Sequence, residues 1–178
     1  VSKVYVTQEN QETSQNSEEL YDTNTLSLYV LSQNNVNDLI VADPALKENL
    51  RVFLAEYRML TDAIRIKDAF IINVGINFDV ILLPNVNSQT VLNACINALK
   101  DYFDIDKWQI NQPILINNVR NVIDQVEGVQ TVKKLEFINK VGESDGYSKL
   151  AYDIKGGTIN EVIYPSLDPS IFEIKFPD

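Results

Sequence analysis

The sequence predicts an α+β fold in which helices pack on one face of a mixed or antiparallel sheet, with a smaller β-rich part toward the C-terminus. Three observations predict this class. Apolar and polar residues alternate over 69–83, and the next two stretches, 88–103 and 115–126, carry apolar residues at helical spacing. Strand-forming residues return over 129–139. The centre of the chain therefore has the order β-α-α-β.

The composition is that of a globular domain with a sizeable core. The chain has 178 residues, of which 45% are hydrophobic and 22% are charged, so one or two domains are expected. We expect a strand and a mobile acidic loop over 1–24, an α+β core domain over 25–140, and a β-rich segment over 141–178.

The first elements are predicted from weak alternation and from composition. Residues 2–7 alternate weakly and predict a short strand, whereas residues 8–19 are polar and acidic and predict a mobile loop. Residues 25–32 are rich in strand formers and predict a second strand.

The first helix is predicted from its start signal. Asp43 is a capping residue, and Pro44 suits the first helical position. The helix is expected to run to about Leu60. Its apolar stripe consists of Leu46, Leu50, Phe53 or Leu54, and Tyr57.

The strongest strand signal lies over 69–83. Every even position from Phe70 to Leu82 is apolar, which predicts a half-buried strand that ends before Pro84. Gly75 allows a bend, so one long strand and two bent strands both remain open.

The later elements follow from capping and turn residues. Asn87 or Ser88 caps a helix over 88–103, and Pro113 precedes a third helix. Gly128 is expected to adopt a positive φ near the end of that helix. The third helix has its apolar stripe at Leu115, Val119, Val122 and Val126. Beyond 129–139 we expect a turn at 142–146, a strand over 147–154, a turn at 155–157, and short final strands within 160–165 and 171–176.

The charge pattern disfavours several partners. The net charge is −10, which repels the phosphates of nucleic acids and anionic membrane surfaces. No apolar run reaches the roughly 18 residues of a membrane span. The N-terminus lacks a secretory signal, and a single cysteine cannot form an internal disulfide, which suits a reducing compartment.

The residue types also limit catalysis. The chain has no histidine, so Ser-His and Cys-His sites cannot form within it, and any chemistry would have to use carboxylates, lysines or tyrosines. Asp104 and Asp106 lack a third ligand at a spacing that would suit a cation. Cys95 lies on the apolar stripe of its helix, which indicates a buried, inert thiol. We therefore predict no catalytic residue, no cofactor and no metal.

Trp108 is the only tryptophan and follows the second helix in a short polar link. Three interpretations are open: a core residue that caps the helical layer, an anchor of a protein interface, or a stacking platform for a ligand. Arg58, at the end of the first helix, is interpreted either as an ordinary ion-pair partner or as a contact between subunits.

Several strings together resemble one family. They are "LKENLRVFLAEYRMLTDAI" (46–64), "FIINVGINFDV" (70–80), "FDIDKWQINQPI" (103–114), "VEGVQTV" (126–132) and "SIFEIKFP" (170–177). They resemble the baseplate wedge subunit of T-even-like contractile-tail bacteriophages, which is a relative of the baseplate J-like proteins. The likeness runs over about 25–178. Because the chain begins with Val1 and that family is longer, we expect a fragment of a C-terminal half.

The resemblance implies a structural role. The family's subunits occur in pairs within each wedge, and their C-terminal region joins neighbouring wedges into a ring around the tail hub. The implied partners are a second copy of the chain, other wedge proteins and the sheath-initiating protein, and the implied location is the virion after assembly in the host cytoplasm. The candidate interface residues are Tyr57, Arg58, Trp108, Phe172 and Phe176.

Two alternatives remain from the residues alone. A carboxylate-based glycan hydrolase is one, although no pair among the 25 acids is singled out by its spacing. A carbohydrate- or receptor-binding tail module is the other.

Overall fold

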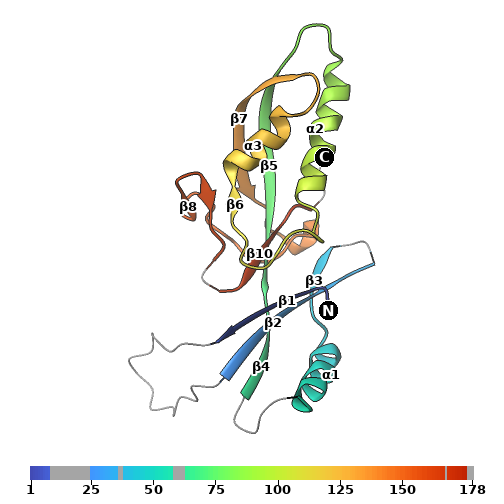
Figure 1. The fold of residues 1–178 in the computed structure, drawn as a ribbon, viewed down its shortest axis with the longest axis vertical. Helices are drawn as coiled ribbons and strands as arrows, with labels where there is room; N and C mark the ends of the chain where they lie inside the picture. The colour runs from blue at the N-terminus through green and yellow to red at the C-terminus, as the bar shows by residue number, and fades with distance from the viewer. Residues whose placement is uncertain (9–24, 36–37, 58–62, 167, 176–178) are drawn as a thin grey trace. The chain divides into compact units, whose positions relative to one another are not determined.

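The computed structural model describes residues 1–8, 25–35, 38–57, 63–166 and 168–175 (Figure 1). It confirms the α+β class, with helices and several mixed sheets. The chain divides into two compact units, Val1–Ala69 and Phe70–Asp178. Most of the acidic loop expected over 8–19 lies outside the described residues.

Unit 1 is a sheet with one helix. Its elements are β1 (Lys3–Gln8), β2 (Thr25–Gln33), β3 (Leu39–Val41), α1 (Pro44–Ala55) and β4 (Ala63–Asp68). The central strand is β2, which pairs antiparallel with β1 along one edge. The opposite edge takes β4 in parallel and, farther along, β3 antiparallel. The helix α1 was predicted with the correct start, but it ends at Ala55 and not at about Leu60. The strands β3 and β4 were not predicted, because short strands gain their stability from partners that are distant in sequence.

The division between the units differs from the one expected at residues 24 and 140. The backbone of β1 pairs with β2 over six register positions, so the N-terminal strand belongs to the same sheet as residues 25–33. Conversely, residues 141–178 supply β10 (Ser170–Glu173), which pairs in parallel with β5 (Phe70–Leu82). Strand pairing over long sequence separations, which composition does not reveal, decides where the units part.

Unit 2 is built around β5. Its further elements are α2 (Ser88–Tyr102), β6 (Ile114–Leu115), α3 (Ile116–Asp124), β7 (Val129–Asn139), the short 3-10 helix η1 (Glu143–Asp145), β8 (Thr158–Ile159), β9 (Val162–Ile163) and β10. One edge of β5 pairs antiparallel with β7, and the start of the other edge pairs with β10. A small second sheet has the order β6-β9-β8.

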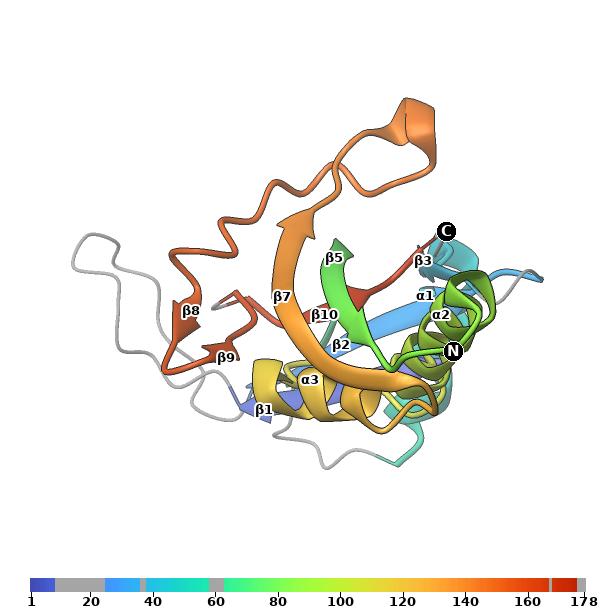
Figure 2. The same cartoon turned by 90° about the horizontal axis from the view of Figure 1, so that it is seen from above.

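The strand β5 is continuous through Gly75, which settles the alternative left open by the sequence. Its pairing with β7 shifts register between Asp79 and Val80 and again between Ile81 and Leu82. Such bulges increase local twist and bend a strand pair. Figure 2 shows β5 and β7 curving together.

The helices of unit 2 pack through short apolar stripes. The Asn87 side chain caps α2 by accepting from the backbone N–H groups of Gln89 and Thr90, at 2.9 and 3.2 Å. The buried residues of α2 are Val91, Cys95 and Leu99, and those of α3 are Val119 and Ile123. The helix α3 packs against α2 and β7.

The third helix differs from its prediction at its start. Leu115 was placed on the apolar stripe, but it is exposed and pairs with Val162 in the β6-β9 ladder. Val119 is fully buried as predicted, and Ile123 is buried as well, because the helix begins at Ile116 and its buried side includes this position. Gly128 has φ +95°, as predicted, and a Cβ there would lie 2.7 Å from Val91 Cγ2.

The predicted strand over 147–154 is not formed. The side chains of two asparagines bind its backbone instead: Asn73 Oδ1 accepts from Ser148 N at 2.7 Å, and Asn139 Oδ1 accepts from Tyr152 N at 2.8 Å. Strand pairing resumes farther along the chain, in the antiparallel β8-β9 hairpin. Its turn residues Asn160 and Glu161 both have positive φ, the conformation of a tight hairpin turn.

Candidate interaction surface

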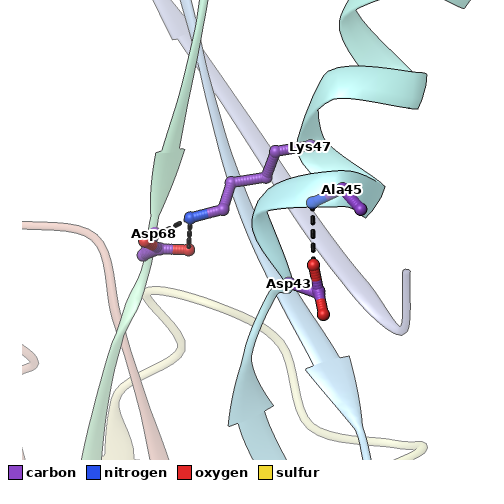
Figure 3. Close-up of polar contacts among 4 residues, drawn as sticks. All are labelled: Asp43, Ala45, Lys47 and Asp68. Carbon is purple, nitrogen blue, oxygen red and sulfur yellow. Dashed lines mark hydrogen bonds and ion pairs between the residues drawn. The ribbon is translucent and has the colours of Figure 1, made fainter.

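The helix α1 begins as the sequence predicts but is incompletely covered by the sheet. Asp43 Oδ1 accepts from Ala45 N at 2.7 Å and caps the first turn, which starts at Pro44 (Figure 3). None of its residues is buried. Because most helices in proteins are stabilised by burial of an apolar face, an uncovered helix points to a partner or to marginal local stability.

An ion pair holds α1 to the sheet of unit 1. Lys47 Nζ donates to both carboxylate oxygens of Asp68, at 2.7 and 2.9 Å (Figure 3). Asp68 is the register partner of Val30, and directly opposed residues of paired strands share a face. The helix therefore lies on the Val30 face of the sheet, beside β4. Leu46, Leu50 and Leu54 are half-buried in this arrangement.

The other part of the α1 stripe is exposed. Phe53 is 57% exposed, Tyr57 is 72% exposed, and their ring centroids are 5.1 Å apart. Val52 is exposed to the same extent as Phe53. We call Val52, Phe53 and Tyr57 the α1 surface. Aromatic side chains exposed as a pair are typical of protein contact sites, where large rigid rings contribute most of the binding energy.

The sheet also presents apolar residues that α1 does not cover. Val4 and Val6 are about half-exposed, and their register partners are Val30 and Leu28. Val4 and Val6 therefore lie on the same face of the sheet as α1, on the edge strand β1. The alternating sequence over 2–7 predicts a strand with one apolar side, but it does not show whether other residues cover that side.

Trp108 is a core residue of unit 2. Only 3% of its surface is exposed, and its ring lies 5.1 Å from that of Phe103 and 5.8 Å from that of Tyr102. The backbone N–H of Trp108 donates to Asp104 O at 3.2 Å, so the polar link folds back and directs the indole inward. Of the three interpretations, a core residue fits the position of Trp108. Direct contact of its indole with a partner would require the link after α2 to rearrange.

The other candidate interface residues divide into two groups. Phe172 is 1% exposed in β10, where its ring lies 5.9 Å from that of Tyr152, so it too is interior. Arg58 and Phe176 lie outside the described residues. Tyr57 is therefore the one candidate among the described residues whose side chain reaches the surface.

The polar groups of unit 2 are used for structure. Glu173 is buried, and its Oε2 accepts from Asn73 Nδ2 at 2.7 Å. The backbone oxygen of Asn73 accepts from Asn139 Nδ2 at 2.9 Å, so this network joins β10, β5 and β7. Asp104 Oδ1 accepts from Asp106 N at 3.1 Å, which is a turn contact. Burial raises the pKa of the Cys95 thiol and keeps it protonated.

Two further properties concern the described residues as a whole. They contain no group of three or more acids or cysteines arranged to hold a metal ion. In the same part of the chain, the helices are too short or too polar to cross a membrane.

Comparisons with known proteins show similarity to a solved structure. No protein-family model and no curated protein matches the chain. A chain in the sixfold-symmetrised cryo-electron microscopy structure of the anti-feeding prophage baseplate is similar, with 16% identity and a TM-score of 0.48. The similarity covers 65% of this chain and 25% of that one, so this chain spans about a quarter of the neighbour's length.

Proposed function

We propose that this chain is a structural component of a phage tail baseplate and joins wedge subunits into a ring around the hub through protein–protein contacts. The sequence resemblance over 25–178 suggests the family. The observation that carries the proposal is the α1 surface, because Phe53 and Tyr57 extend an apolar stripe that the sheet of unit 1 leaves uncovered.

The physical argument concerns what such a helix requires. Exposed apolar area is costly in water, at about 25 cal/mol per Å². A subunit that docks Phe53 and Tyr57 into a partner recovers this free energy without changing its own core. The charged neighbours Glu48 and Arg51 are mutually paired at 2.8 Å and exposed, so they would form a polar rim.

The proposed partners are a second copy of the chain, other wedge proteins and the sheath-initiating protein, within the virion. In this proposal Tyr57 contacts the partner directly, and Arg58 lies beside it in sequence. Trp108 and Phe172 contribute indirectly by fixing the packing of unit 2. Phe176 remains a proposed contact.

Sedimentation of a doubly substituted chain tests the proposal. We expect Phe53→Ala with Tyr57→Ala to retain the wild-type circular dichroism spectrum and to weaken self-association by about tenfold or more. Ile159→Ala is the matched control, since Ile159 is 59% exposed on the β8-β9 hairpin of unit 2. Equal self-association of the double variant and the wild type would contradict the role of the α1 surface.

A wild-type chain that stays monomeric at all concentrations would contradict the proposed contact between copies. A tail-particle reconstruction tests the location itself. A density for this chain outside the baseplate, or one in which α1 touches only solvent, would contradict the proposal.

A further inference from the structure

Among the described residues, one edge of β5 pairs with β10 only at the start of the strand. In the described residues, β10 pairs with this edge only over Phe70–Asn73. The other edge of β5 pairs with β7 as far as Leu82. Among the described residues, the stretch from Val74 to Phe78 is therefore a strand with one paired edge and one edge without a strand partner.

The hydrogen-bond pattern shows which amide groups face the free edge. Asn73 O accepts from Lys140 N at 2.9 Å, so the amide groups of Asn73 point toward β7. Along a strand, successive residues point their N–H and C=O groups to alternate edges. Ile76 and Phe78 therefore direct theirs away from β7. Consistently, Phe70, which lies four residues before Val74 and therefore points the same way, donates its N–H to Pro169 O on the β10 side at 2.9 Å.

A cavity of about 230 Å³ lies along this free edge. Five consecutive residues of β5, Val74 to Phe78, line it, together with residues of α2 such as Ile96 and Leu99. Consecutive strand residues point to opposite faces, so a cavity lined by all five borders the backbone of β5 and not one face alone. A second cavity shares Ile76 to Phe78 and Ile96, extends toward the start of α2, and also reaches Lys134 and Glu136 of β7.

The groove has a basic end in an acidic protein. Lys100 and Lys140 line the first cavity, as does Lys175, and its described lining contains no acid. The net charge of the whole chain is −10, so this concentration of cations runs against the composition. The second cavity carries mixed charge, with Lys134 beside Asp79 and Glu136. A ligand with its acidic groups next to Lys100 and Lys140 matches this distribution.

We propose that the free edge of β5, from Val74 to Phe78, binds an extended acidic segment of another protein chain as an added strand. The main chain of that segment hydrogen-bonds to the outward amide groups of Ile76 and Phe78. Its apolar side chains enter the groove beside α2, and its carboxylates contact Lys100 and Lys140. The cavity is smaller than the roughly 300–1,000 Å³ of small-molecule sites and suits single side chains of a peptide.

Peptide binding to the whole chain tests this site separately from the α1 surface. The probe is a blocked eight-residue peptide in which Glu alternates with Val, and the readout is titration calorimetry. Two derivatives are N-methylated at every second residue, in opposite phases. Because an added strand pairs through one edge, one phase is expected to bind like the parent and the other to lose binding by about tenfold or more. Equal binding of both derivatives, or no binding of the parent, would overturn the proposal.

Charge variants of the chain test the polarity of the groove. We expect Lys100→Glu and Lys140→Glu, each alone, to weaken binding and together to weaken it by about tenfold or more, whereas the charge-matched single control Lys155→Glu, in the exposed turn before β8, leaves it unchanged. An equal loss of binding in the control would show that the effect comes from the net charge of the chain, and it would contradict the proposed site. Amide hydrogen exchange gives a readout independent of charge: slowed exchange at Ile76 and Phe78 on peptide addition is expected, and unchanged exchange at both contradicts strand addition.

Discussion

Replacement of Trp108 by alanine separates a core role from a contact role. The indole is 3% exposed and touches the rings of Tyr102 and Phe103, so its removal leaves a cavity between α2 and the link that follows it. An anchor of an interface would instead be exposed in the free chain, and its loss would weaken association with little effect on folding.

The magnitude follows from the buried area. A tryptophan buries about 250 Å², which at about 25 cal/mol per Å² stabilises the fold by up to about 6 kcal/mol. The buried Trp108 Nε1 has no hydrogen-bond partner among the described residues, and an unpaired donor costs about 1–3 kcal/mol. We therefore expect Trp108→Ala to lower the free energy of unfolding by about 3–5 kcal/mol, in the range of large-to-small aromatic substitutions.

Urea unfolding followed by far-ultraviolet circular dichroism measures this change. Intrinsic fluorescence is unsuitable, because the substitution removes the only tryptophan. Trp108→Phe retains a ring and removes the unpaired donor, so its loss is expected to be smaller, at about 1–2 kcal/mol. Tyr57→Ala is the exposed control and is expected to change stability by less than about 0.5 kcal/mol.

If Trp108→Ala folds and lowers the free energy of unfolding by less than about 1 kcal/mol, the packing argument is refuted, because removal of a well-packed aromatic side chain lowers it by more than that. If such a variant also lost self-association, Trp108 would be reassigned from the core to the interface.

Three further predictions concern other parts of the chain. A double-mutant cycle of Lys47→Met and Asp68→Asn is expected to give a coupling of about 1 kcal/mol by urea unfolding, since the pair is short and partly shielded; a zero coupling would show that α1 is held by its apolar contacts alone. Gly128→Ala is expected to lower the melting temperature and cost about 1–3 kcal/mol, because its φ is +95° and an added Cβ has no room; an unchanged melting temperature contradicts this geometry. Burial raises the pKa of the Cys95 thiol above its usual 9.0 and that of the Tyr102 phenol above its usual 10.0, so the unfolded chain releases these protons first and stability is expected to fall as the pH rises through and beyond these values; stability that stays constant from pH 8 to 11 rules this out.

The sequence predicted the elements whose signals are local. The cap of α2 at Asn87, the strand over Phe70–Leu82 and the positive φ of Gly128 all follow from one residue or from a short periodic pattern. Side-chain alternation is a property of the strand itself, so it is visible without knowledge of any partner. The strand expected over 147–154 failed because Asn73 and Asn139, both distant in sequence, bind its backbone.

The candidate surfaces were only partly predictable. The apolar stripe of α1 includes Tyr57 in the sequence, but the sequence could not show that the sheet covers only the leucine side of that stripe. The sequence left three interpretations of Trp108 open, as a core residue, an interface anchor or a ligand-stacking platform, and only the fold of the link after α2 turns it inward. Likewise, the free edge of β5 depends on where β10 stops, at Glu173.

The sequence by itself determined the α+β class, most strand and helix positions, the acidic character and the absence of histidine chemistry. These properties depend on composition and on periodicity within short segments, so they can be read without knowing which segments pack together. Only the tertiary structure decided the division into two units, the burial of Trp108 and Phe172, and the exposure of Phe53, Tyr57 and the β5 edge. The physical reason is that burial and strand pairing are set by contacts between residues far apart in the chain, and neither can be read from one segment alone.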